Sequence, residues 1–289
     1  MLPPTSPPRP SGNRPVHSSA PRTTSSTPDP HRRTLAMTPI VDLQKQLKSL
    51  KLSGISQVLE LRLLEAQGNQ LSHAQFLSLL LDDEVELRRE RKLHRLIRQA
   101  QIGTDHTLES FDFHFNPAIN AARIKALATG EFIRKGENVF FLGPTGTGKT
   151  HLTRALCHQA CRGYLTVAYY KFYQLFNDLE MARLNNRHER LLRRLCKVDL
   201  LAIDDFAFRK LDAREAEYLY AIVDSRYRVR SMIINSNRDI SDWMGIFPDP
   251  IIANAIMDRL AQNAHQITIT GESYRKKLAP GKKTIEAKT

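Results

Sequence analysis

One stretch of the chain constrains its fold more than any other: residues 138–156 read NVFFLGPTGTGKTHLTRAL. An apolar run predicts a buried strand, a glycine-rich turn follows, and a helix begins directly after the turn. The turn matches the pattern G-x-x-x-x-G-K-[ST] in full, and the strand and helix stand where that motif requires them. This combination predicts a phosphate-binding loop in a parallel α/β sheet.

The residues of this loop have predicted roles in holding a nucleotide. Glycines permit the tight turn in which backbone N–H groups point at phosphate oxygens, and the following helix adds its positive end. Lys149 is expected to neutralise the β- and γ-phosphates, and the Thr150 hydroxyl to bind Mg²⁺. No Asn-Lys-x-Asp guanine-reading motif occurs, which favours adenine and therefore ATP. The predicted nucleotide-binding residues are Gly143, Pro144, Thr145, Gly146, Thr147, Gly148, Lys149 and Thr150.

Two aspartates end another apolar strand farther along the chain, in the segment VDLLAIDDF. Ligands of open α/β sheets lie at the carboxyl ends of the strands, where this strand carries Asp204 and Asp205. We therefore predict that Asp204 holds Mg²⁺ together with Thr150, and that Asp205 orients and deprotonates the attacking water. The alternative is a simple cap between a strand and a turn.

A later strand ends in amides, in the segment SMIINSNRD. If that strand ends beside the γ-phosphate, Asn235 or Asn237 could hydrogen-bond the attacking water. Asparagines are also common in any turn that follows a strand. The pattern alone leaves both interpretations open.

After Gly136 strands alternate with helices, which predicts a parallel sheet with helices on both faces. Strands are expected at Val139–Leu142, Leu165–Tyr169, Leu200–Ile203, Met232–Asn235 and Gln266–Ile269. Helices are expected at Lys149–Cys161, Tyr170–Lys197 (broken), Asp212–Arg228 and Ile251–Ala261.

The first third of the chain has a different composition. Prolines interleaved with Ser, Thr and Arg predict disorder up to Met37, which is an alternative start of the protein. Helical periodicity then begins, and Ser72 with Gln75 predicts a capping box at the start of a third helix. We predict four segments: a disordered leader at 1–37, an all-helical domain at 38–106, an ATPase domain at 107–275 and a basic flexible tail at 276–289.

The net charge of +13 and the pI near 9.8 favour a polyanionic partner. Nucleic acid is favoured over a membrane because no strongly apolar helix face accompanies the charge, and no apolar run is long enough to span a bilayer. Basic residues crowd the third helix, where phosphate contact and a solvated charged face both fit. They are Arg88, Arg89, Arg91, Lys92, Arg95 and Arg98.

Three cysteines, Cys157, Cys161 and Cys196, are too few for a disulfide framework and indicate a reducing compartment. His158 beside Cys157 raises the possibility of a metal site, but zinc needs a fourth nearby ligand and usually a tighter spacing. We therefore expect Cys157 and Cys161 to be small core residues.

Three phenylalanines alternate with other residues in the segment LESFDFHFNPAI: Phe111, Phe113 and Phe115. They could pack this linker onto the next domain, or they could stack on a purine base. The period of two favours packing.

Several segments together resemble one protein family. LESFDF, GENVFFLGPTGTGKTHL, LLAIDDF, INSNRDISDW and IMDRLAQNAHQITITGESYR are similar to segments of the IstB-like ATP-binding proteins of insertion sequences. That family is related to the DnaC helicase loaders within the AAA+ superfamily, and the resemblance spans about residues 47–277. It implies a cytoplasmic bacterial ATPase that forms an ATP-dependent homo-oligomer on double-stranded DNA, remodels the DNA, and recruits and stimulates a separate transposase.

The resemblance also implies roles for single residues. Asn237 aligns with the family's sensor 1, and Arg259 aligns with the arginine finger that reaches the γ-phosphate of a neighbouring subunit. An ion pair with Asp258 is the alternative for Arg259. Asp205 stands where most AAA+ proteins have glutamate, which implies slow or partner-gated hydrolysis.

Basic residues within 170–197 suit the DNA-facing interior of a helical assembly, where phosphate contacts would make binding salt-sensitive. A solvated, arginine-rich helix is the alternative. The candidates are Arg183, Arg187, Arg190, Arg193, Arg194 and Lys197. Two other functions remain: a DnaC-like helicase loader, and a metabolic P-loop kinase, which leaves the positive charge unexplained.

Overall fold

The computed structural model describes residues 40–274, which fall into two compact units that divide after Leu52. In the first unit, the helix α1 (Ile40–Ser49) has no buried residue. The predicted leader, the alternative start at Met37 and the predicted tail lie outside the described residues. The predicted segment boundaries therefore stay predictions.

The second unit begins with a helical hairpin, α2 (Ser53–Gly68) and α3 (His73–Ala100). The predicted capping box is confirmed: the Ser72 hydroxyl accepts a hydrogen bond from the Gln75 backbone N–H, and the Gln75 side chain accepts one from the Ser72 N–H. Buried Glu84 of α3 accepts hydrogen bonds from two backbone N–H groups in the first turn of α2. This contact satisfies donors that a helix start leaves unpaired and ties the two helices together.

A parallel sheet forms the centre of the second unit, with the strand order β2-β3-β4-β1-β5. The strands are β1 (Asn138–Leu142), β2 (Val167–Lys171), β3 (Leu200–Asp204), β4 (Ser231–Ser236) and β5 (Ala264–Thr268). All the predicted strands are present. The predicted fold class is confirmed as α/β, with a five-stranded parallel sheet that is flanked and preceded by helices.

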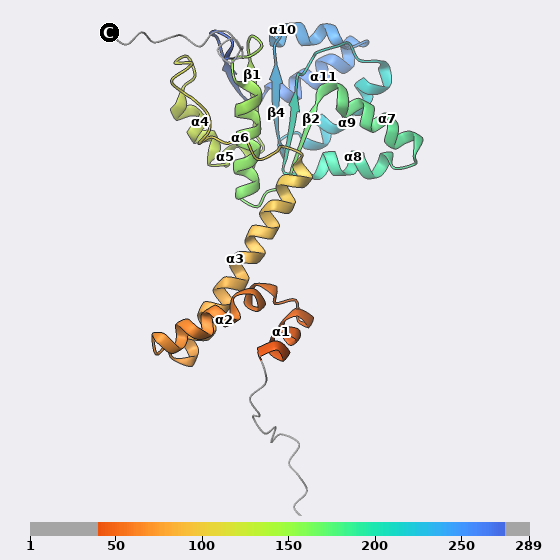
Figure 1. Ribbon diagram of the computed structural model, residues 1–289. Helices are drawn as coiled ribbons and strands as arrows, with labels where there is room; N and C mark the ends of the chain where they lie inside the picture. Colours follow the sequence, from red (N-terminus) through yellow and green to blue (C-terminus); the bar gives the residue numbers. More distant parts are fainter. Residues whose placement is uncertain (1–39, 275–289) are drawn as a thin grey trace, which may run out of the picture. The chain divides into compact units, whose positions relative to one another are not determined.

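Helices cover both faces of this sheet (Figure 1). One face packs against α4 (Ala121–Ala128), α5 (Glu131–Arg134), α6 (Lys149–Arg162) and the C-terminal part of α3. The other face packs against α7 (Phe172–Leu184), α8 (His188–Lys197), α9 (Ala213–Arg226), α10 (Ile240–Trp243), a 3-10 turn (Met244–Ile246) and α11 (Pro250–Ala261). None of the helices in the described part is long and apolar enough to cross a bilayer.

Local contacts explain where β2 begins and where the helix that follows it is broken. The strand β2 begins at Val167 rather than Leu165, because the Leu165 N–H closes the end of α6 with a 3.0 Å hydrogen bond to the Ala160 carbonyl. The helix expected over 170–197 is broken as predicted, between α7 and α8, where Asn186 adopts a left-handed conformation with φ of 54°.

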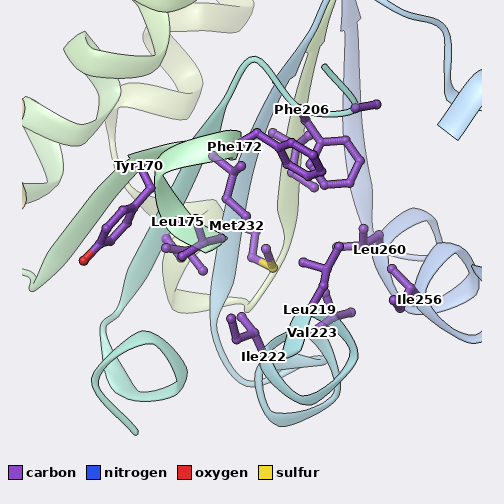
Figure 2. Packing of buried hydrophobic residues seen from close by; sticks show 14 of the residues in the cluster. Tyr170, Phe172, Leu175, Phe206, Leu219, Ile222, Val223, Met232, Ile256 and Leu260 are labelled. Carbon is purple, nitrogen blue, oxygen red and sulfur yellow. The ribbon is translucent and has the colours of Figure 1, made fainter. Parts of the chain in front are cut away.

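An aromatic cluster fixes the ends of β3 and β4, which carry the predicted metal and water-activating residues. Phe206 directly follows the two aspartates and is fully buried. It packs against Phe172 (Figure 2) and against Trp243. Burying each such ring contributes roughly 1.5–3 kcal/mol to folding. The Phe206 N–H also donates to the Asn235 carbonyl at 2.8 Å, and its carbonyl accepts from the Ser236 hydroxyl at 2.9 Å. The two strand ends are therefore held in one arrangement.

Candidate functional site

The predicted phosphate loop connects β1 to α6, and its glycines adopt conformations that other residues avoid. The φ angles of Gly143, Gly146 and Gly148 are 135°, 87° and 100°. A Cβ atom on Gly143 would lie 2.0 Å from the Ile269 carbonyl oxygen, and one on Gly148 would lie 2.9 Å from the Phe111 ring. The loop therefore needs glycine both for its backbone conformation and for its close approach to neighbours.

The loop lines a cavity of about 320 Å³. Lys149 begins α6, is buried, and donates from its ammonium to the Gly143 and Pro144 carbonyls at 2.8 and 2.7 Å. Those two residues support the loop but do not line the cavity. The predicted residues that do line it are Thr145, Gly146, Thr147, Gly148, Lys149, Thr150, Asp205, Asn235 and Asn237. The structure thus brings most of the predicted nucleotide-binding and water-activating residues to one place.

Asp204 lies at the carboxyl end of β3, is 1% exposed, and is held from three sides. The Thr150 hydroxyl donates to Asp204 Oδ1 at 3.3 Å, and the Asn235 amide of β4 donates to the same oxygen. From β2, the Tyr169 hydroxyl donates to Asp204 Oδ2 at 2.5 Å. The predicted metal-binding pair, Thr150 and Asp204, is therefore in direct contact.

Asp205 and the two asparagines occupy different positions around this carboxylate. Asp205 has a φ of 55°, which is uncommon for a residue other than glycine, and its backbone N–H donates to Asp204 Oδ1 at 3.0 Å. Strained conformations of this kind concentrate at functional sites. Both asparagines line the cavity, but Asn237 is exposed, whereas Asn235 is buried and contacts Asp204 and the Thr150 hydroxyl.

Aromatic side chains form another part of the cavity lining. Phe115 and Tyr274 pack edge to face with ring centroids 4.7 Å apart, and Phe111 and His151 do so at 5.1 Å. Aromatic faces of this kind suit stacking on a purine base. The expected packing is confirmed for Phe111, which also contacts the core. Packing alone was an incomplete prediction, because Phe111 and Phe115 both line the cavity.

His151 connects this aromatic wall to the phosphate loop. Its Nε2 lies 2.9 Å from the Thr107 carbonyl oxygen and 3.3 Å from the Ser110 hydroxyl. Burial lowers the pKa of His151 below its ordinary value, which favours the neutral ring at pH 7. The segment that carries Phe111 and Phe115 is thus fixed to His151, the residue that follows Thr150.

The donor groups around the cavity fit ATP and Mg²⁺. Backbone N–H groups at the start of α6 and the Lys149 ammonium suit a triphosphate. The Thr150 hydroxyl and the Asp204 carboxylate are hard oxygen donors of the kind that Mg²⁺ prefers.

A model of the family described as IstB-like ATP binding protein matches residues 45–280. The chain belongs to this family. One relative of this IstB-like chain, named as an ATP-binding protein of an insertion sequence in Mycobacterium tuberculosis, is 35% identical over 84% of this chain and 97% of its own length. The ATP-binding protein named for insertion sequence IS21 in Pseudomonas aeruginosa is 34% identical over 82% of this chain and 89% of its own length.

Similarity of the IstB-like chain to solved structures is weaker. The DnaC helicase loader covers 57% of this chain and 97% of its own, at 18% identity and a TM-score of 0.47. The AMPPCP-bound DnaA from Aquifex aeolicus covers 61% of this chain and 54% of its own, at 22% identity and a TM-score of 0.49.

Arg259 of the IstB-like chain lies on α11 and does not line the cavity. Its Nε donates to an Asp224 carboxylate oxygen of α9 at 2.9 Å, and its guanidinium carbon lies 5.4 Å from the centroid of the Tyr220 ring. Asp258, the alternative partner expected from the sequence, instead accepts a hydrogen bond from Gln262. That alternative was wrong about the acid, because Asp224 rather than Asp258 pairs with Arg259.

The predicted DNA-binding residues of this IstB-like protein are all exposed on α7, α8 and the loop between them. Arg183 pairs with Glu180 at 2.6 Å, and Arg194 donates to the Gln99 carbonyl at the end of α3 at 2.8 Å. The others form no ion pair with any residue of the described range; they are Arg187, Arg190, Arg193 and Lys197.

Cys157 and Cys161 belong to α6 and lie buried in the core, as predicted. Burial raises the pKa of both thiols, to about 12 for Cys161. Thiols of this kind are largely unreactive at neutral pH.

Sequence reasoning missed Tyr169, and it left Asn235 undecided. A tyrosine in an apolar strand is typical of a core residue, and nothing in its sequence neighbours indicates that its hydroxyl reaches Asp204. Only the strand order β2-β3-β4, which the sequence did not provide, places Tyr169 and Asn235 on opposite sides of Asp204.

Proposed function

We propose that this chain is an ATP-dependent, DNA-binding AAA+ regulator of transposition. In this proposal it hydrolyses ATP slowly, assembles with copies of itself on double-stranded DNA, remodels that DNA, and recruits and stimulates a transposase. The family match to ATP-binding proteins of insertion sequences supports the biological setting. The observation that carries the proposal is the contact between Thr150 and Asp204 at the edge of a cavity lined by the phosphate loop.

The proposed reaction is hydrolysis of ATP to ADP and phosphate. Thr150 and Asp204 hold Mg²⁺, which when bound neutralises charge on the phosphates. Lys149 and the loop N–H groups hold the phosphate oxygens. Asp205 orients and deprotonates the attacking water, and Asn237 donates a hydrogen bond to it from the neighbouring strand end. The exposure of Asp205 and Asn237 to one cavity supports these roles.

Hydrolysis depends on assembly in this proposal, because Arg259 acts on the nucleotide of a neighbouring subunit. Within its own chain Arg259 does not line the cavity, and it rests against Asp224. An arginine supplied in trans stabilises charge that develops on the transferred phosphoryl group. The site is therefore incomplete in a single subunit.

DNA binding is assigned to the exposed basic residues of α7 and α8. Arg187, Arg190 and Arg193 form no ion pair with other described residues, so their charge is available to phosphates. Contacts with phosphate carry little sequence information and weaken as salt rises. We therefore expect target DNA to be chosen loosely.

The family match favours a transposition helper over a helicase loader, because the matched relatives are named for insertion sequences. The transposase partner is tested by co-purification with the product of a neighbouring DDE-type transposase gene. Capture of a replicative helicase instead would support the loader.

The central experiment is a DNA-binding titration against salt, carried out with ADP and with a non-hydrolysable ATP analogue. We expect tight binding only with the analogue, and a linear loss of log affinity with log salt concentration. Sedimentation of the same samples should show larger assemblies with the analogue. A protein that stays monomeric and binds no DNA with either nucleotide contradicts the proposal.

A further inference from the structure

Tyr169 of β2 makes a contact that a core tyrosine does not need. Its ring packs with the buried residues on the α6 face of the sheet, and its hydroxyl reaches across to the neighbouring strand β3. There it donates to Asp204 Oδ2 at 2.5 Å. Both groups are buried, at 6% and 1% exposure, so the hydrogen bond is shielded from water and correspondingly strong.

The Asp204 carboxylate has a different partner on each oxygen. Oδ2 accepts from Tyr169, whereas Oδ1 accepts from Thr150, Asn235 and the Asp205 backbone N–H. The outer torsion of an aspartate side chain is soft, so a carboxylate without fixed partners can rotate about its Cβ–Cγ bond. Donors on opposite sides remove that freedom and keep Oδ1 facing the Thr150 hydroxyl.

The phenol is itself held in place by α6. The Arg154 guanidinium, one helical turn after Thr150, lies over the Tyr169 ring with its carbon 4.9 Å from the ring centroid.

We propose that Tyr169 is a positioning residue for the Mg²⁺ site, and that it acts by fixing the Asp204 carboxylate. The inference rests on the proposed roles of Thr150 and Asp204 and adds a residue from a third element. Groups that hydrogen-bond to a metal ligand orient it, and their loss typically lowers metal affinity or activity about 10- to 100-fold. Tyr169 is not expected to touch the nucleotide, because it does not line the cavity.

The test compares Tyr169→Phe with Tyr170→Phe. Each variant removes one buried phenol hydroxyl from β2, but adjacent residues of a strand point to opposite faces, and Tyr170 packs in the other core (Figure 2). Binding of a fluorescent non-hydrolysable ATP analogue is measured in EDTA and then in rising Mg²⁺. Thermal melting of both variants reports on the fold.

In Tyr169→Phe we expect unchanged affinity in EDTA and an about 10-fold higher Mg²⁺ concentration for half-maximal enhancement of binding. ATP turnover should partly recover at high Mg²⁺. Tyr170→Phe should titrate like the wild type. Arg154→Met uncovers the Tyr169 ring but keeps the Tyr169 hydroxyl. It should shift the Mg²⁺ midpoint in the same direction as Tyr169→Phe, but by a smaller amount.

Two outcomes overturn the inference while the proposed function stands. One is a Tyr169→Phe protein with the wild-type Mg²⁺ midpoint, and the other is an equal loss of affinity with and without Mg²⁺, which indicates a purely structural role. A wild-type protein that binds the analogue without any response to Mg²⁺ contradicts the proposed metal site itself. The three results are distinguishable in one titration.

Discussion

The carboxyl end of β3 and the outer surface of α8 both carry residues with a proposed function, but their environments are opposite. Asp204 is 1% exposed and accepts hydrogen bonds from three side chains. Arg190 and Arg193 on α8 are exposed and form no ion pair within the described range. The first region is a fixed arrangement, and the second is a charged surface.

This difference determines how each region responds to substitution. Removing one partner of a buried hydrogen bond leaves the other group unsatisfied. This lowers stability by about 1–3 kcal/mol, and by more where the remaining group is charged. Exposed charges act through a screened field, so their effects are small, roughly additive and dependent on salt. Single substitutions should therefore change function strongly at the carboxyl end of β3 and only gradually on α8.

Arg259 belongs to neither region, so its substitution tests whether a residue outside both can have a large effect. It is partly exposed, with 27% of its side chain accessible, and it is paired with Asp224. We expect Arg259→Ala to lower ATP turnover by about 10³-fold or more, as loss of an arginine finger does, with unchanged affinity for an ATP analogue. Turnover and analogue affinity are measured on the same preparation.

Mixing supplies the control for Arg259. An Arg259→Ala subunit keeps its own Asp205, and an Asp205→Asn subunit keeps its Arg259, so a mixed assembly contains some complete sites. We expect partial recovery of turnover on mixing. Mixtures as inactive as the separate variants would argue against action in trans.

Asp205→Asn tests the water-activating role next to buried Asp204, at a residue that is exposed to the cavity. Loss of a general base typically costs about 10²–10⁴-fold in rate, so ATP should bind and persist. We expect an ATP-bound assembly that stays on DNA, measured as nucleotide retained after gel filtration. Asp242→Asn makes the same charge change at an exposed position outside the cavity and should behave like the wild type. Unchanged turnover in Asp205→Asn would place the base elsewhere.

The residues at the carboxyl ends of β1 and β3 could be predicted well from the sequence, because the motifs there encode backbone geometry. Gly143 and Gly148 are required by positive φ angles and close contacts, and the apolar run of β3 places Asp204 at a strand end. Such constraints act over a few residues, so they are visible in a single sequence. The strands, the phosphate loop and the capping box at Ser72 were predicted for this reason.

Contacts between distant segments could not be predicted in the same way. Tyr169 reaches Asp204 only because β2 is the neighbour of β3, and Phe115 reaches the cavity only because its segment meets Tyr274. The period of two around Phe115 describes a strand-like segment but not what that segment faces. Likewise, Asp224 pairs with Arg259 across two helices, and no spacing rule connects them.

Lys149→Ala should weaken nucleotide binding by about 100-fold, since hydrogen bonds to charged groups contribute roughly 1.5–3 kcal/mol each. The affinity of the ATP analogue is measured by titration, and ATP-dependent assembly should be lost with it. Lys125→Ala removes the same charge from an exposed position on α4 and serves as the control. Wild-type affinity in Lys149→Ala would remove the phosphate-loop assignment.

The smallest expected effects lie on α8. Arg190→Ala and Arg193→Ala should each weaken DNA binding similarly for all sequences and reduce the slope of log affinity against log salt by about 1. Arg134→Ala is the control, because it removes an exposed arginine that is already paired with Glu131 at 2.7 Å on α5. Slopes that fall equally in all three variants would mean that only net charge matters. Slopes that fall in the α8 variants alone would locate the DNA phosphates on that surface.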